Sequence, residues 1–168
     1  MSDFARALPT ILAAEGGYSD HPDDKGGKTN FGVTERVYHA WLAMKFQKPK
    51  PVKEITPEEV AAIYSKSYWQ AMKCDELPWP VSLVAFDSAV NHGVGRASKM
   101  LQDAAGVLAD GKIGPKTLAA VRDNPDGVAK AMLEAREAFY KLLAMNASQA
   151  KFLKGWLKRL EHLKAAMA

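Results

Sequence analysis

Apolar residues recur at helical spacing along nearly all of this chain, and few segments alternate apolar and polar residues as a strand does. The first helix shows the pattern in Phe4, Leu8, Ile11 and Leu12. Residues 16–32, rich in Gly, Asp, Asn and Pro, are typical of a loop or hairpin. We therefore predict a mainly α fold with at most a short β-hairpin near residues 16–33.

Capping signals locate several of the predicted helices. Thr34 is a candidate N-cap of a helix with Val37 on its inward face, and Thr56, Pro57 and Glu59 form a capping box with proline at the first helical position. Two longer helices, over about residues 126–145 and 149–167, are predicted to complete the chain. The 168 residues suffice for one domain with its own core.

Two carboxylates stand out near the start of the chain. Glu15 ends the first predicted helix, because two glycines follow it, and Asp24 lies in the glycine-rich loop, where Asp20 and Asp23 are the alternatives to it. The negative end of the helix dipole favours the protonated form of a carboxyl group, as a general acid requires. This layout suits acid/base chemistry on a polar polymer.

Composition indicates the charge of the expected partner and argues against disulfide and metal chemistry. The net charge of +4 favours an anionic partner, and the single cysteine, Cys74, excludes an intramolecular disulfide. The four histidines lack paired ligand spacing, so we expect no metal and no cofactor. The first residues do not have the pattern of a signal peptide, so we expect synthesis in the cytoplasm without one.

Four motifs carry a resemblance to known proteins. Glu-Gly-Gly-Tyr at residues 15–18 and Asp-x-Gly-Gly-x-Thr-Asn-Phe-Gly at residues 24–32 resemble glycoside hydrolase family 108, which contains N-acetylmuramidases, many of them phage endolysins. Residues 86–93 and 110–117 resemble the predicted peptidoglycan domain that usually accompanies it.

The resemblance implies a lysozyme-like single domain with two lobes, a catalytic half at residues 1–75 and a helical peptidoglycan-domain half at 76–168. It implies cleavage of the β-1,4 bond between N-acetylmuramic acid and N-acetylglucosamine, with Glu15 as the catalytic glutamate. The spacing of Glu15 and Asp24 is similar to that in phage-type lysozymes, where a downstream threonine positions water. Thr29 is the nearest candidate for that role.

Four further residues are candidates for substrate binding. Tyr18 is suited to stack on a sugar ring or to anchor its loop on the core. Asn30 suits either substrate contact or turn formation. Asn91 and His92 follow an apolar helix, where they either contact the N-acetyl or peptide groups of a substrate or cap the helix.

The C-terminal helix combines a basic face with an apolar stripe that includes Phe152 and Trp156. Such helices can bind bacterial membranes, so weak membrane contact is one interpretation. The resemblance favours another, in which Trp156 packs inside and Arg159 forms an ion pair within the fold.

Peptidoglycan is the expected partner, nucleic acid is not expected, and a monomer is the simplest state. The resemblance to phage endolysins implies action in the periplasm after release, through a holin. Two alternatives remain open. One is a lytic transglycosylase, which needs only one carboxyl group and forms an anhydro product, and the other is a noncatalytic wall-binding module.

Overall fold

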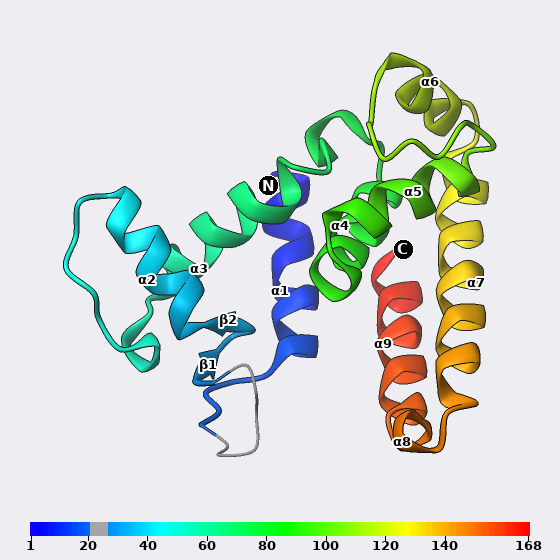
Figure 1. The fold of residues 1–168 in the computed structure, drawn as a ribbon. Coiled ribbons are helices and arrows are strands. Elements are labelled where there is room, and N and C mark those ends of the chain that lie inside the picture. Colours follow the sequence, from blue (N-terminus) through cyan, green and yellow to red (C-terminus); the bar gives the residue numbers. More distant parts are fainter. Residues whose placement is uncertain (21–26) are drawn as a thin grey trace. The chain divides into compact units, whose positions relative to one another are not determined.

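The computed structural model describes residues 1–20 and 27–168 (Figure 1). The chain divides into two compact units, residues 11–67 and residues 1–10 together with 68–168. Both units are built mainly of helices, and the strands assigned in the described ranges form a two-stranded hairpin. The predicted mainly α fold class is confirmed. The grouping into halves at residues 1–75 and 76–168 stays a prediction.

The unit of residues 11–67 begins with the end of helix α1 and places the hairpin before two short helices. Its elements are α1 (Asp3–Glu15), β1 (Thr29–Asn30), β2 (Val33–Thr34), α2 (Glu35–Met44), η1 (Val52–Glu54), α3 (Pro57–Tyr64) and the start of the π-helical segment η2 (Ser65–Trp69).

Local capping explains where α2 and α3 begin. The Thr34 hydroxyl accepts a hydrogen bond from the Val37 N–H at 3.2 Å. The Thr56 hydroxyl accepts from the Glu59 N–H at 3.2 Å, while the Glu59 carboxylate accepts from the Thr56 N–H at 2.9 Å. These contacts satisfy N–H groups that a helix start leaves without partners. Both predicted helix starts are confirmed.

The predicted inward face of α2 is wrong at one position. Tyr38 and Leu42 are fully buried, whereas Val37 is 41% exposed. Successive helical residues are rotated by about 100° around the axis, so a narrow buried stripe centred on Tyr38 and Leu42 leaves Val37 at its edge. The side chain of Val37 therefore contributes to the surface of this unit.

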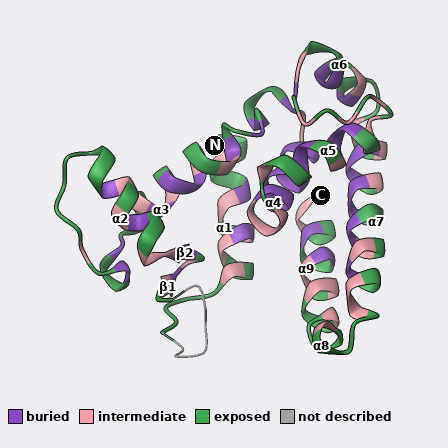
Figure 2. Cartoon of the chain, in the orientation of Figure 1, coloured by how far each residue is buried: buried purple, intermediate pink, exposed green. Residues whose placement is uncertain are grey.

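The unit of residues 1–10 and 68–168 has the larger helical core. Its later elements are η3 (Cys74–Glu76), α4 (Val81–His92), α5 (Val94–Ala104), α6 (Pro115–Asp123), α7 (Pro125–Ala144), α8 (Ala147–Ala150) and α9 (Leu153–Ala166). Helix α4 is buried continuously over residues 81–89 (Figure 2), and most of these residues are apolar, as the sequence predicted. Helices α5 and α7 pack against α4, and α9 packs against α7.

The predicted single helix over residues 149–167 is instead two helices. The Asn146 side chain accepts a hydrogen bond from the Ser148 N–H at 3.0 Å and starts the short helix α8. The Phe152 N–H then bonds to the Gln149 carbonyl at 3.0 Å, a bond between residues three apart that tightens the chain and ends α8. Helix α9 starts afterwards. No helix among the described residues is long and apolar enough to cross a membrane.

Candidate active site

Glu15 is the last residue of α1, as predicted, and its side chain is partly buried. The N–H of Gly16 still bonds to the Leu12 carbonyl at 3.3 Å, but Gly16 has a φ of 79°, in the region that favours glycine. The helix therefore ends directly after Glu15. The Glu15 carboxylate is therefore carried by a helix and not by a loop, and the helix restricts its position.

The hairpin turn approaches Glu15 closely. Asn30 pairs with Val33 across the hairpin, and the two turn residues, Phe31 and Gly32, have φ values of 49° and 74°. Positive φ at both central residues is the type I′ pattern of two-residue hairpins. A Cβ atom placed on Gly32 would lie 3.0 Å from Glu15 Oε2 and 3.1 Å from Glu15 Cβ. Only a glycine leaves the space that the Glu15 side chain occupies.

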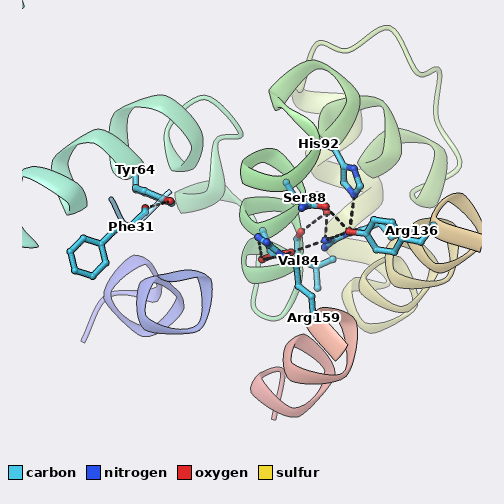
Figure 3. A network of polar contacts seen from close by, with 10 residues as sticks. Phe31, Tyr64, Val84, Ser88, His92, Arg136 and Arg159 are labelled. Carbon is cyan, nitrogen blue, oxygen red and sulfur yellow. Dashed lines mark hydrogen bonds and ion pairs between the residues drawn. The ribbon is translucent and has the colours of Figure 1, made fainter. Parts of the chain in front are cut away.

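Tyr64, at the end of α3, contributes a hydroxyl group to the same place. The same Gly32 Cβ position lies 2.6 Å from the Tyr64 hydroxyl oxygen, so this oxygen and Glu15 Oε2 are both within about 3 Å of one point. The hydroxyl donates a hydrogen bond to the Phe31 carbonyl at 2.7 Å (Figure 3). Tyr64 is only 2% exposed. The bond holds the turn that faces Glu15.

Sequence reasoning missed the role of Tyr64. Its helical spacing predicts a core residue, and its ring is indeed buried. The position of its hydroxyl depends on the packing of α3 against a turn 33 residues earlier in the chain. No local pattern in the sequence signals that contact.

Of the other two proposed catalytic residues, the structure describes Thr29 but not Asp24. Thr29 lies in β1, and its backbone exchanges two 2.9 Å hydrogen bonds with Ser19, which joins Ser19 to the hairpin. Asp24 lies outside the described residues, which omit 21–26. The roles of Asp24 as second carboxylate and of Thr29 in positioning water stay predictions.

Tyr18 and Asn30 occupy different environments. Tyr18 is 42% exposed, and the Lys53 ammonium group lies 5.6 Å from the centre of its ring. The Asn30 amide is buried and donates to the carbonyls of Val52 and Lys53 at 3.3 and 3.4 Å, which ties the hairpin to η1. Asn30 therefore has a structural role, through bonds to a distant segment and not through a local turn. Substrate contact by either residue stays a prediction.

Asn91 and His92 lie at the end of α4, in the other unit. The Tyr140 hydroxyl donates to the Asn91 side-chain oxygen. The Arg136 guanidinium donates to His92 Nε2 at 3.2 Å. Burial, reinforced by the Arg136 charge, lowers the pKa of His92 to about 4. His92 is thus a neutral acceptor at pH 7, and its contact with substrate stays a prediction.

A buried ion network adjoins this corner. Asp87 on α4 accepts from Arg136 on α7 at 2.8 Å and from Arg159 on α9 at 2.8 Å. Asp87 is 1% and Arg136 is 0% exposed. Ser88 extends the network, because it receives a bond from Arg136 at 3.4 Å and donates to the Val84 carbonyl (Figure 3). The ion pair expected for Arg159 is present, while sequence reasoning gave no role to Asp87 and Arg136.

Cys74 and Trp156 pack within their unit. Cys74 is buried, and burial raises the pKa of its thiol. The Trp156 ring stacks on Tyr140 at 5.2 Å between ring centres, as the resemblance of the terminal helix implied. Among residues 1–20 and 27–168, no group of three His, Cys, Asp or Glu side chains is arranged to hold a metal ion.

Comparisons with known proteins identify the family. The glycosyl hydrolase 108 profile matches residues 8–93, and the predicted peptidoglycan domain matches residues 96–161. A solved structure described as Brucella abortus SagA is similar, with 39% identity over 97% of this chain and 92% of that chain and a TM-score of 0.81. This likeness confirms the predicted lysozyme-like fold class. No curated protein matches the chain.

The first profile covers more than half of the chain and includes Glu15 and the hairpin, while the second covers α5 to most of α9. Together they assign glycoside hydrolysis to the first match and peptidoglycan as the substrate. The chain belongs to the glycosyl hydrolase 108 family and is a peptidoglycan hydrolase.

Proposed function

We propose that the protein is an N-acetylmuramidase that cleaves the β-1,4 bond between N-acetylmuramic acid and N-acetylglucosamine. The observation that carries the proposal is the position of Glu15, at the end of a helix with its carboxylate against the hairpin turn at Gly32. Family membership supports the reaction class, and the resemblance of the Glu-Gly-Gly-Tyr motif supports the choice of glutamate.

The chemistry assigns Glu15 the role of general acid. A glycosidic oxygen is a poor leaving group, so the Glu15 carboxyl donates its proton to that oxygen as the bond to the anomeric carbon breaks. The developing oxocarbenium ion is then attacked by water. In this proposal Asp24 is the second carboxylate and Thr29 helps to position the water molecule.

The surroundings of Glu15 suit an acid that must keep one orientation. The close approach of Gly32 restricts the side chain on one side, and the buried Tyr64 ring limits movement of the turn. A carboxyl group held by regular elements loses little conformational freedom when substrate binds. Tyr18 and Asn30 in this unit, and Asn91 and His92 in the other, are the proposed substrate contacts.

We further propose that the enzyme is a phage or prophage endolysin. In this proposal it is made in the host cytoplasm, reaches the periplasm through a holin and acts on peptidoglycan as a monomer. The similarity to the glycosyl hydrolase 108 family supports this biological setting, because phage endolysins are among the proteins that the motif resembles.

Mass spectrometry of the soluble products from purified peptidoglycan tests the proposed reaction. The wild-type protein should release muropeptides with reducing N-acetylmuramic acid ends, and Glu15→Gln should release none because it cannot donate the proton. Glu54→Gln is the matched control, since Glu54 is an exposed glutamate of the same unit. It should retain the wild-type products.

Other products would contradict the proposal in distinct ways. Anhydro ends would identify a lytic transglycosylase, and reducing N-acetylglucosamine ends would identify cleavage of the other glycosidic bond. Full activity of Glu15→Gln would remove Glu15 as the acid. Binding to the wall without any product from the wild-type protein would identify a noncatalytic module.

A further inference from the structure

Phe46, directly after α2, is placed where neither burial nor backbone preference explains a phenylalanine. Its side chain is fully exposed, and its φ is 55°. The Phe46 N–H bonds to the Ala43 carbonyl and the Gln47 N–H to the Leu42 carbonyl, each at 3.0 Å. These two bonds form a Schellman motif, in which the left-handed residue is usually glycine.

A phenylalanine at this position is unfavourable in two ways. The left-handed conformation strains a residue with a Cβ atom, and the exposed ring leaves apolar surface in water. A strained, exposed aromatic residue that contributes nothing to the core points to a function on the surface. The function must use an apolar ring that projects from the protein.

The surface next to Phe46 is also apolar. Met44 is 60% and Val37 is 41% exposed. A groove of about 330 Å³ lies beside them on the outer face of α2 and α3. Its lining consists mainly of apolar side chains with one lysine: Val37, Ala40, Trp41, Met44, Ile63, Lys66 and Ser67. Phe46 is fully exposed and follows Met44, a residue of this lining, by two positions.

Three exposed lysines lie in or close in sequence to this surface. Lys45 lies next to Phe46, with its ammonium group 4.8 Å from the centre of the Trp41 ring, and Lys48 and Lys66 are exposed. None of these three lysines forms an ion pair with any residue that the structure describes. Their charges are available to an anionic partner that also accepts an apolar ring.

We call the part of this surface formed by Met44, Lys45, Phe46 and Lys48 the α2 tip. We propose that the α2 tip binds the surface of an anionic phospholipid bilayer. Phe46 and Met44 enter the boundary between headgroups and acyl chains, and the lysines contact lipid phosphates. A glycan strand is the weaker candidate, because stacking on a sugar ring removes only one face of Phe46 from water, whereas the boundary between headgroups and acyl chains takes up the whole ring.

The α2 tip does not include Glu15. Membrane binding there would be a second activity beside the proposed hydrolysis of peptidoglycan. Membrane contact through the α2 tip would hold the enzyme at the bilayer surface without changing its activity on isolated peptidoglycan. It also differs from the membrane contact expected of the C-terminal helix, which places Phe152 beside Lys151 in the other unit. The two can be compared directly.

Sedimentation of the full-length protein with vesicles tests the proposal. Vesicles of equal parts phosphatidylglycerol and phosphatidylcholine should bind the wild-type protein, and vesicles of phosphatidylcholine alone should bind it far more weakly. Phe46→Gly should weaken binding by about tenfold or more, since it removes the ring that enters the bilayer. Replacing Lys45 and Lys48 together by Gln should weaken binding by on the order of tenfold.

Phe46→Gly separates loss of the ring from loss of the fold. Because glycine relieves the left-handed strain, this variant should unfold at the same temperature as the wild type or at a higher one. It should also hydrolyse purified peptidoglycan at the wild-type rate. Phe152→Ala is the matched control, as Phe152 is 47% exposed and has Lys151 5.0 Å from its ring centre. It should bind vesicles like the wild type.

Three outcomes would overturn the proposal. The first is no preference of the wild-type protein for anionic vesicles. The second is equal vesicle binding by Phe46→Gly and the wild type, including the case in which Phe152→Ala alone loses binding. The third is a loss of sedimentation with purified sacculi by Phe46→Gly while vesicle binding is unchanged, which would identify the glycan as the partner.

Discussion

Replacing Gly32 by alanine should move Glu15 and destabilise the unit of residues 11–67. The new Cβ would lie 2.6 Å from the Tyr64 hydroxyl oxygen and 3.0 Å from Glu15 Oε2, with Glu15 Cβ at 3.1 Å. The hydroxyl belongs to a buried ring, so it cannot swing away as the end of a flexible side chain would. Glu15 or the turn must shift instead.

Two contributions set the size of the effect. The φ of 74° at Gly32 places an alanine in the left-handed region, at a cost of roughly 1–2 kcal/mol. Crowding against Tyr64 and Glu15 adds about 1–3 kcal/mol, as overpacking does in a filled core. The free energy of unfolding should therefore fall by about 2–5 kcal/mol. A displacement of Glu15 by about 1 Å would lower activity by on the order of 100-fold.

Gly106→Ala is the matched control for backbone strain alone. Gly106 has a φ of 69°, and an added Cβ there meets nothing within 4 Å. This variant should lose only about 1–2 kcal/mol and keep its activity. Urea denaturation measures the stability of both variants, and release of reducing ends from peptidoglycan measures hydrolysis. Equal stability of the two variants, with full activity of Gly32→Ala, would refute the argument that Gly32 constrains Glu15.

Two further predictions concern the other unit. Asp87→Asn should lower the free energy of unfolding by about 3–5 kcal/mol, because Arg136 and Arg159 lose their buried counter-charge. Urea denaturation should show a far smaller change for Glu134→Gln, which removes only the exposed pair between Glu134 and Lys130 on one helix; similar losses would contradict the argument. Burial lowers the pKa of His92 from 6.5 to about 4, so the unfolded chain binds a proton that the folded protein does not bind between these values. Stability should fall as the pH drops through this window, and His92→Gln should flatten the dependence in denaturation curves at several pH values; an unchanged slope would exclude His92 as its source.

Local signals predicted much of the fold correctly. The caps at Thr34 and Thr56 act over three residues, so they can be recognised without knowledge of the rest of the chain. The end of α1 at Glu15 follows equally from the glycines after it. The break between α8 and α9 was missed because a single tightened turn interrupts an otherwise helical apolar pattern.

The candidate site was predicted in part for the same reason. Glu15 and the hairpin lie in one short stretch of sequence, and both carry recognisable patterns. Tyr64 comes from a later helix, and its helical spacing indicates only that the ring is buried. The exposed position of Phe46 could not be anticipated either, since an apolar residue at a helix end is ordinarily interpreted as part of the core.

The sequence by itself determined the helical class, the helix starts and the end of α1 at a glutamate, because capping, glycine conformation and periodicity act between neighbours in the chain. The tertiary structure alone decided that Glu15 and the Tyr64 hydroxyl both lie close to Gly32 and that Asp87 pairs with Arg136 and Arg159. These contacts join residues 17 to 72 positions apart. They form only when packing of the apolar faces fixes which helices meet, and this choice is not encoded in any one segment.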